Sequence, residues 1–233
     1  MTNIIPENNS DGPKKDVTIV NYGLGNLKSV ANIIKKMGGH PTISSSKEDI
    51  KNAEKLILPG VGAFDEGMNN LEKMDLINML NIKVLDEKIP ILGICLGMQL
   101  ITKRSDEGQK EGLGWIDAET LSFANTFKNL NGNNNNIVGN NYTKNLKVPH
   151  MGWNYVKVEK ETPLFKEMYE NPRFYFVHSY YVNCNNKEDI LTTTNYGIEF
   201  TSAVSKNNIY ATQFHPEKSH KFGMKLIENF IKL

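Results

Sequence analysis

A glycine-flanked cysteine is the most distinctive chemical feature of the sequence. It stands in Gly93-Ile94-Cys95-Leu96-Gly97, between an apolar run and a segment with helical spacing. This arrangement has the form of a nucleophile elbow, in which the nucleophile holds a strained backbone and small neighbours let a substrate approach. The start of a helix also favours a thiolate, because its unpaired N–H groups attract negative charge. The competing interpretation is a buried structural cysteine.

A histidine and a glutamate two positions apart, His215 and Glu217, could complete a thiol-based site. Pro216 biases His215 toward extended backbone, in which residues i and i+2 project to the same side. A carboxylate beside one imidazole nitrogen fixes the tautomer and supports the imidazolium, which leaves the other nitrogen to take a proton from a thiol. We therefore consider Cys95, His215 and Glu217 a candidate triad, against the alternative of a surface loop with incidental His and Glu.

A glycine-rich turn, Pro59-Gly60-Val61-Gly62, follows a short apolar run. Glycines there permit backbone conformations that turn N–H groups toward a developing oxyanion, a role that requires no side chain. Taken alone, the segment indicates only a turn.

Gly23 and Gly25 lie between strand-like and helix-like residues, as in a dinucleotide-binding loop. The third glycine is missing, because Lys28 stands there, and residues 44–46 are serines where an acidic residue would be needed. We reject a dinucleotide site on these grounds.

A zinc site built from His215, Glu217, His220 and a cysteine is also disfavoured. Cys95 already lies in the elbow, and Cys184 stands in a polar segment without ligand spacing. We expect neither a metal nor another cofactor.

The elements that must position these residues alternate between strand and helix. Residues 17–20 form a short apolar run before helical spacing over 26–37, residues 56–58 precede the turn at 59–62, and residues 91–94 precede helical spacing over 96–103. Such alternation predicts an α/β fold with a mainly parallel sheet covered by helices on both faces.

Beyond residue 153 the pattern changes to shorter runs. Residues 155–158, 174–182 and 209–214 are expected to form strands of antiparallel character, and residues 222–231 a final amphipathic helix.

Length and composition favour one domain at residues 16–233, preceded by a flexible tail at 1–15 and interrupted by an asparagine-rich loop at 128–147. Lys and Arg number 27 against 26 Asp and Glu, so no basic excess suggests a nucleic-acid partner. Two cysteines in unlike settings argue against a disulfide framework, and no apolar stretch is long enough for a membrane helix. We expect a cytoplasmic protein.

Six ordered motifs together carry a family resemblance: NYGLGNLKSV, LPGVGAF, GICLGMQL, PHMGWN, FVHSYY and QFHPEKS. They closely resemble those of class I (triad-type) glutamine amidotransferases, and among these the glutaminase subunits of imidazole glycerol phosphate synthase. The resemblance implies a flavodoxin-like fold with an added antiparallel part. It also implies glutamine hydrolysis, in which Cys95 attacks the carboxamide, His215 moves the proton and Glu217 orients His215.

The resemblance further implies how L-glutamine is held. Backbone amides of Gly60, Val61, Gly62 and Leu96 would bind the oxyanion. Glutamine itself would be bound by Gly62, Gln99, Glu107, His178, Ser179 and Tyr180, and the carboxylate of Glu107 matches the substrate's ammonium group.

By the same resemblance, ammonia passes to a (βα)8-barrel cyclase or synthase subunit within a heterodimer. The matching interface positions are Asn26, Met151, Trp153, Tyr175 and Lys218. The acceptor could be the synthase of histidine biosynthesis or a sugar amidotransferase of surface-polysaccharide biosynthesis. Two other interpretations stay open: a free-standing thiol hydrolase of γ-glutamyl compounds, and a degenerate relative kept as a binding module, although all three triad residues stand. The tail, the insert and His220, where a small residue is more usual, depart from the family pattern.

Overall fold

The computed structural model describes residues 15–132 and 146–233, and one large sheet organises them. Its strands are β1 (Asp16–Val20), β2 (His40–Ser44), β3 (Leu56–Gly60), β4 (Ile91–Cys95), β5 (Ala118–Ser122), β7 (Lys157–Val158), β9 (Tyr180–Cys184), β10 (Ile190–Tyr196), β11 (Ile198–Lys206) and β12 (Ile209–Thr212). They run in the order β2-β1-β3-β4-β12-β11-β10-β7, and β9 pairs with β11 and β5. A separate ribbon consists of β6 (His150–Tyr155) and β8 (Arg173–His178).

The half of the sheet formed by β2, β1, β3, β4 and β12 is parallel, as the alternating pattern predicts. The remaining pairs are antiparallel. Strand β12 belongs to both halves, because it pairs parallel with β4 and antiparallel with β11. The antiparallel character predicted for residues 209–214 is confirmed by the pairing with β11, but the parallel pairing with β4 was not predicted, and the strand ends earlier, at Thr212.

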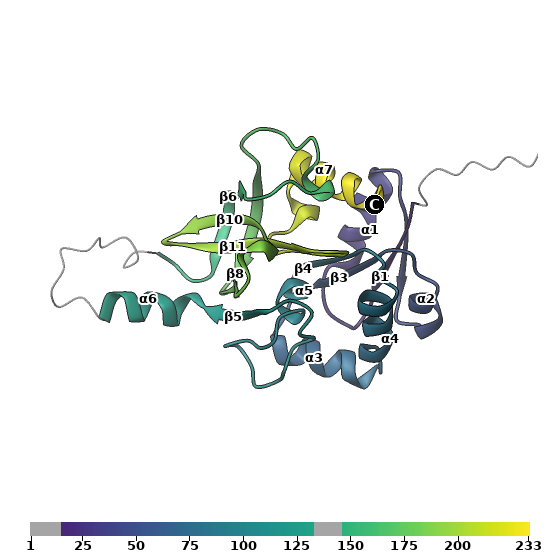
Figure 1. Cartoon of the computed structure of the whole chain (residues 1–233), viewed down its shortest axis with the longest axis horizontal. Coiled ribbons are helices and arrows are strands. Elements are labelled where there is room, and N and C mark those ends of the chain that lie inside the picture. Colours follow the sequence, from purple (N-terminus) through teal and green to yellow (C-terminus); the bar gives the residue numbers. More distant parts are fainter. Residues whose placement is uncertain (1–14, 133–145) are drawn as a thin grey trace, which may run out of the picture.

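Helices cover both faces of the sheet. They are α1 (Leu27–Lys36), α2 (Lys47–Lys51), α3 (Phe64–Lys73), α4 (Ile77–Asn81), α5 (Leu96–Leu100), α6 (Phe123–Gly132) and α7 (His220–Ile231), with short turns η1 (Ile82–Asp86), η2 (Pro163–Phe165), η3 (Lys187–Asp189) and η4 (Pro216–Lys218). Figure 1 shows α1 and α7 on one side of the sheet and α3, α4 and α5 on the other.

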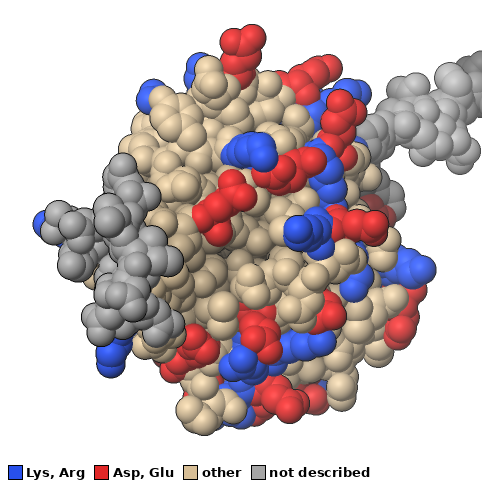
Figure 2. Space-filling view, turned by 60° about the vertical axis from the view of Figure 1, so that its left-hand side comes forward, with Lys and Arg blue, Asp and Glu red and all other residues tan. Residues whose placement is uncertain are grey.

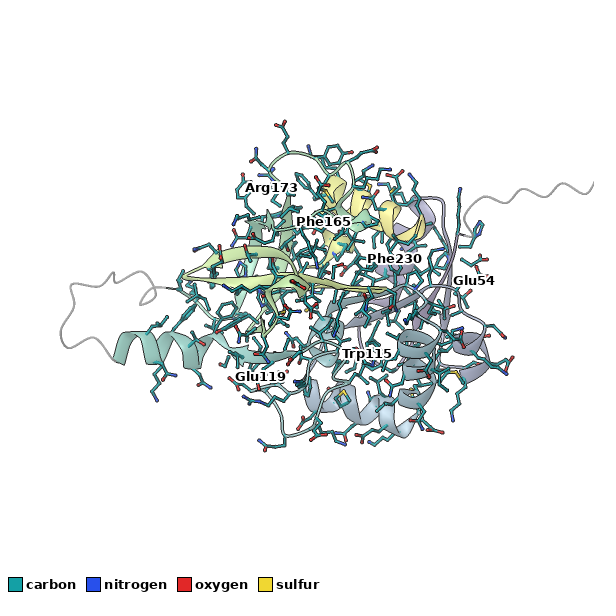
Figure 3. All side chains as sticks on the ribbon, viewed as in Figure 1. Glu54, Trp115, Glu119, Phe165, Arg173 and Phe230 are labelled. Carbon is teal, nitrogen blue, oxygen red and sulfur yellow. The ribbon has the colours of Figure 1, made fainter. Side chains whose placement is uncertain are left out.

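Each face has its own apolar core. The cluster under α1 and α7 includes Phe230, and the cluster under α3, α4 and α5 includes Trp115. Figure 3 shows these two side chains on opposite sides of the sheet. Because both faces are covered, the central parallel strands β3, β4 and β12 are buried along their whole length, whereas the edge strand β2 is mostly exposed.

The turn from β4 into α5 depends on two glycines. A Cβ atom at Gly97 would lie 1.8 Å from the carbonyl oxygen of Leu58, and one at Gly93 would lie 2.9 Å from the carbonyl oxygen of Gly97. Helix α5 therefore packs directly against the backbone of β3. Only glycine permits this approach, which explains why the cysteine between them has small neighbours.

Several predicted boundaries differ from those in the structure. The helix predicted over 96–103 ends at Leu100, because the Lys103 N–H bonds to the carbonyl of Ala118 in the next strand. The strand predicted over 174–182 divides at Ser179 into β8 and β9, which lie in different sheets.

The strand predicted over 155–158 is likewise divided. Its first residue closes β6 and its last two form β7, because buried Val156 lies between them.

The loop predicted over 128–147 is wrong at its start, where α6 continues to Gly132. The apolar side chains of Phe123 and Phe127 are both buried, and they anchor this helix to the core. Residues 133–145 lie outside the described ranges, as do residues 1–14 of the predicted tail.

Charges of both signs are interspersed over the face seen in Figure 2. This distribution accords with the balanced composition of 27 basic and 26 acidic residues. Within the two described stretches, no helix has the length and apolar character required to cross a membrane.

Substitution Gly97→Ala is expected to lower the free energy of unfolding by roughly 3 kcal/mol, because the added methyl group would displace the backbone of β3. Denaturant unfolding measures the change. Gly38→Ala is the control: Gly38 has φ +80° with no atom near its Cβ position, so its cost should be only about 1 kcal/mol. Equal losses at both positions would contradict the close packing of α5 on β3.

Candidate active site

Cys95 stands at the last position of β4, immediately before α5. Its φ of 54° and ψ of −105° form a strained conformation for a residue with a side chain. The residue is only 7% exposed, and its Sγ lies 4.0 Å from the carbonyl oxygen of Val177 and 3.7 Å from Nε2 of Gln213. The predicted elbow therefore holds the thiol at the edge of the sheet, aimed away from the strand.

His215 and Glu217 meet as the sequence predicts. Nδ1 of His215 lies 2.8 Å from Oε1 of Glu217, and the two side chains are 2% and 3% exposed. The His215 N–H bonds to the carbonyl of Tyr175 on β8, and the Ser219 hydroxyl donates to the His215 carbonyl. The backbone of the histidine is thus fixed from two sides.

Electrostatic interactions oppose burial at His215. Burial lowers the pKa of the imidazole, but hydrogen bonding and charge interaction with the Cys95 thiol and with Glu217 outweigh it, so the pKa is raised above its ordinary value. Nε2 is buried and has no partner within standard hydrogen-bond geometry, so its contribution to the pair comes from its nearness to the thiol. The arrangement favours an imidazolium beside a thiolate, with a carboxylate behind the ring.

A pocket of about 240 Å³ opens in front of the sulfur. Its lining combines the predicted oxyanion and substrate residues Val61, Gly62, Leu96, Gln99, Glu107, His178, Ser179 and Tyr180 with Cys95, Pro149 and Val177. Gly60 ends β3 beside Cys95, its register partner on β4. Residues from four separate motifs therefore converge on one cavity.

Glu107 contributes the pocket's carboxylate. One of its oxygens accepts the backbone N–H of Phe64 at 2.9 Å. Burial raises the pKa of this group, the Phe64 hydrogen bond lowers it, and the nearby Asp65 raises it further, for a net increase. A partly desolvated carboxylate of this kind is stabilised by a cation, which suits the ammonium group of an amino acid.

The turn at residues 22–26, rejected above as a dinucleotide loop, packs behind the glycine-rich turn. A Cβ atom at Gly60 would lie 2.2 Å from the hydroxyl of Tyr22, and one at Gly25 would lie 3.3 Å from Cα of Gly60. Tyr22 is fully buried. The two glycine-containing turns pack against each other. This packing explains why Gly25 stands in the turn at residues 22–26, and no dinucleotide is needed to explain it.

A chain of hydrogen bonds fixes residues 178–180, which line the pocket. Nδ1 of His178 lies 2.6 Å from the carbonyl of Tyr180, Nδ1 of His150 lies 2.8 Å from Nε2 of His178, and the Asn154 amide reaches Nε2 of His150 at 3.2 Å. The Tyr180 carbonyl can only accept, so Nδ1 of His178 carries the proton and Nε2 of His178 is left as an acceptor. His150 then donates from Nδ1 to Nε2 of His178, and its own Nε2 accepts from Asn154, so both rings are neutral.

The pKa values of both histidines agree with these tautomers. Burial lowers the pKa of His150 to about 4. Burial also lowers the pKa of His178 to about 3, assisted by His150 and His215 and opposed by the bond to Tyr180. The pair is uncharged at neutral pH.

Four of the five predicted interface residues form one surface. Met151 and Trp153 are 62% and 44% exposed on β6, Trp153 faces Tyr175 across the ribbon, and the Lys218 ammonium lies 5.8 Å from the Tyr175 ring. His220, which departs from the family pattern, stacks on Trp153 at 5.5 Å. Asn26 has a structural task of its own, since its side chain caps α1 by accepting the Ser29 N–H.

Sequence reasoning assigned no role to four residues at this site: Pro149, Val177, Gln213 and His150. Gln213 and His150 stood in motifs quoted for their neighbours, and each is a polar residue at a strand boundary, since Gln213 follows the last residue of β12 and His150 begins β6. Val177 acts through its carbonyl, and no side-chain pattern could have found it.

Within residues 15–132 and 146–233, no group of three or more His, Cys, Asp or Glu side chains is arranged to hold a metal ion. Both cysteines are free, and burial raises the pKa of Cys184 to about 11. A thiol with that pKa is a poor nucleophile at neutral pH.

Comparison with known families gives a match over nearly the whole chain. The glutamine amidotransferase class-I family matches residues 18–233. This match confirms the resemblance stated from the six motifs.

Individual relatives are similar over their full length. Imidazole glycerol phosphate synthase subunit HisH 2 of Methanococcus maripaludis is 54% identical over 216 residues, which cover 93% of this chain and 98% of the relative. The subunit of the same name from Pseudomonas aeruginosa is 46% identical over 217 residues, covering 93% and 99%. Subunit HisH 1 of M. maripaludis is 41% identical over 220 residues, also covering 93% and 99%.

Solved structures share the fold at low sequence identity. PurLQS from Thermotoga maritima superimposes with a TM-score of 0.67 at 16% identity, covering 93% of this chain and 97% of that one. The glutaminase domain of CTPS from Trypanosoma brucei, with bound acivicin, gives a TM-score of 0.58 at 17% identity, covering 93% and 90%. These likenesses confirm the predicted fold class.

The neutral histidine pair predicts a pH-dependent stability. In the unfolded state both histidines bind a proton as the pH falls below about 6.5, whereas in the folded state His150 and His178 bind one only near pH 4 and pH 3. The unfolded state therefore binds more protons between these values, and the melting temperature should drop as the pH falls through this range. His150→Asn keeps a donor to His178 but removes one titrating group, so its melting temperature should fall less steeply. The control His40→Asn changes an imidazole whose side chain is 74% exposed and should keep the wild-type slope. An unchanged slope in His150→Asn would refute the buried neutral pair.

Proposed function

Because this chain belongs to the class I glutamine amidotransferase family, we propose that it is the glutaminase subunit of an imidazole glycerol phosphate synthase, which hydrolyses L-glutamine to glutamate and ammonia for histidine biosynthesis. One observation carries the proposal: a thiol in a strained elbow lines a pocket that contains a carboxylate, and a buried imidazole that is paired with a second, buried carboxylate interacts with this thiol. The likeness to the HisH subunits supports the same reaction.

The Cys95 thiolate attacks the carboxamide carbon of glutamine, forming a C–S bond and an oxyanion. The oxyanion collapses and breaks the C–N bond, while the His215 imidazolium gives its proton to the leaving nitrogen. Ammonia departs and a glutamyl thioester remains. Water, deprotonated by His215, adds to the thioester, and breakage of the C–S bond releases glutamate and regenerates the thiolate.

The pocket supplies binding and charge stabilisation. Glu107 would hold the ammonium group of glutamine, beside Gln99 and the backbone of Gly62 and residues 178–180. The oxyanion would be held by backbone N–H groups of Leu96 and of the turn at residues 60–62. Neither a metal nor another cofactor takes part in this scheme.

A (βα)8-barrel synthase subunit would dock on the surface formed by Met151, Trp153, Tyr175 and Lys218, with Asn26 at its margin. Exposed aromatic residues beside a lysine are typical interface anchors. The heterodimer would work in the cytoplasm, where a free thiolate is stable.

A second acceptor is the alternative, and the presence of two related subunits in one organism motivates it. M. maripaludis carries both a HisH 1 and a HisH 2 subunit, and this chain is 54% identical to the second and 41% to the first. Two such subunits in one cell could supply different synthases, for example one that aminates a sugar. Identifying the barrel protein that co-purifies with this chain, and the product it forms, decides between the acceptors.

Cys95→Ala is expected to abolish glutamine-dependent product formation by the complex, because the nucleophile is gone, while ammonium salts still supply the synthase. Glutamate release and synthase product are measured with each nitrogen source. Cys184→Ala is the matched control and should retain both activities. Glutamine-dependent turnover in Cys95→Ala would overturn the proposed function.

Glu217→Gln is expected to lower kcat by roughly 10²- to 10⁴-fold and to change its pH profile. Glu217 helps to raise the pKa of His215, so without its charge the imidazolium loses its proton at lower pH and the alkaline limb moves toward acid. The profile of glutamate release is measured from pH 5 to 10. Glu228→Gln, which removes a surface ion pair on α7, is the control; an alkaline limb unmoved in Glu217→Gln would contradict the role of Glu217.

A further inference from the structure

Gln213 is a fully buried side chain that contacts the reacting sulfur. Its Nε2 lies 3.7 Å from Sγ of Cys95, within hydrogen-bond distance for sulfur, and its Oε1 accepts a hydrogen bond from Nε2 of Gln99 at 3.2 Å. It therefore links the nucleophile to a residue that lines the substrate pocket. Neither the triad nor the oxyanion turn accounts for this contact.

The surrounding backbone fixes where this amide can point. The Gln213 N–H bonds to the carbonyl of Ser202 on β11, and the hydroxyl of Thr212 bonds to the carbonyl of Phe214. All of these residues are buried. The side chain cannot turn toward solvent, so its polar atoms must find partners inside the protein.

The two ends of the Gln213 amide have different partners. Its carbonyl oxygen accepts from Nε2 of Gln99, and its N–H end faces the sulfur. The same bond leaves Oε1 of Gln99 available to accept from a ligand in the pocket.

A thiolate at this position requires donors. The Val177 carbonyl, 4.0 Å from the sulfur, can only accept and therefore disfavours an anion. The His215 imidazolium and the Gln213 amide act in the opposite direction. Hydrogen bonds to charged groups are the strong ones, so a buried amide N–H aimed at the sulfur stabilises its charged form.

We propose that Gln213 is a further catalytic residue, whose amide N–H stabilises the Cys95 thiolate while its carbonyl orients Gln99 toward the substrate. The inference rests on the proposed glutaminase function. Gln213 acts twice in the cycle: before attack, when the sulfur carries the charge, and during release of glutamate, when the C–S bond breaks and its electron pair returns to sulfur. In the thioester that exists between these two steps the sulfur is neutral, so the hydrogen bond that it accepts from Gln213 is weaker.

Two variants separate the two tasks. Gln213→Met is similar in volume and removes both the donor to sulfur and the acceptor for Gln99. Gln213→Glu retains an acceptor for Gln99 but replaces the donor with negative charge.

The first readout is the pH dependence of Cys95 alkylation by iodoacetamide, followed by mass spectrometry of the peptide that contains it. The midpoint of alkylation should rise by about one pH unit in Gln213→Met, which means about tenfold less thiolate at any pH below the wild-type midpoint. It should rise further in Gln213→Glu, because a negative charge replaces the donor. The second readout is glutamine turnover by the complex: kcat should fall about tenfold at pH 7 in Gln213→Met and further in Gln213→Glu, whereas KM should rise more in Gln213→Met than in Gln213→Glu.

Asn229→Leu is the matched control, because it removes another buried amide, one that donates to the carbonyls of Leu164 and Lys166. It should lower the melting temperature without moving the alkylation midpoint. In the wild-type protein, where folding is not at issue, alkylation of Cys95 should shift the side-chain amide proton resonances of Gln213.

An alkylation midpoint unchanged in folded Gln213→Met and Gln213→Glu, or unshifted Gln213 resonances, would overturn the proposal. Alkylation requires no glutamine turnover, so this result is distinct from a failure of the proposed function, which Cys95→Ala tests.

Discussion

The parallel pairing of β4 with β12 is the constraint on which the site depends. Ile94 is the register partner of Thr212, so the chain leaves the sheet at the same edge after both strands. Cys95 follows the first of these residues directly, and His215 lies three positions beyond the second. Because neighbouring parallel strands end at the same edge of a sheet, the residues that follow them are brought close together even when they are distant in the sequence.

Close packing converts this neighbourhood into a defined geometry. The glycines around Cys95 let α5 lie against the backbone of β3, and the turn at residues 22–26 supports the glycine-rich turn at residues 59–62 from behind. The strained φ of Cys95 persists because the surrounding contacts leave no room to relax it. The cost of that strain is met by the large apolar cores on both faces of the sheet.

Buried histidines in this protein take opposite charge states according to their partners. His215 lies between a thiol and a carboxylate, both of which favour its imidazolium. His150 and His178 have only neutral partners in their hydrogen-bond chain and stay uncharged. The His150–His178 pair therefore makes residues 178–180 rigid without placing a second positive charge close to the His215 imidazolium.

Much of this could be predicted from the sequence, and the remainder has identifiable physical reasons. The elbow at Cys95 and the His215 to Glu217 contact follow from local rules: apolar runs that end in glycine, and extended backbone before a proline. The parallel partner of β12 could not be predicted, because strand pairing depends on topology rather than on the residues of the strand. The Gln213 contact was equally hidden, since an amide just beyond a strand end shows its role only when the facing sulfur is in place.

Strand β6 alternates between two unrelated tasks along its length. Met151, Trp153 and Tyr155 point outward, whereas His150 is buried against His178, and Asn154 turns back to bond His150. Since successive residues of a strand face opposite ways, the outward set can change without moving the inward set. A change among the outward side chains can therefore alter what this surface contacts while the buried hydrogen-bond chain behind it stays in place, and His220, stacked on Trp153, belongs to that replaceable outer layer.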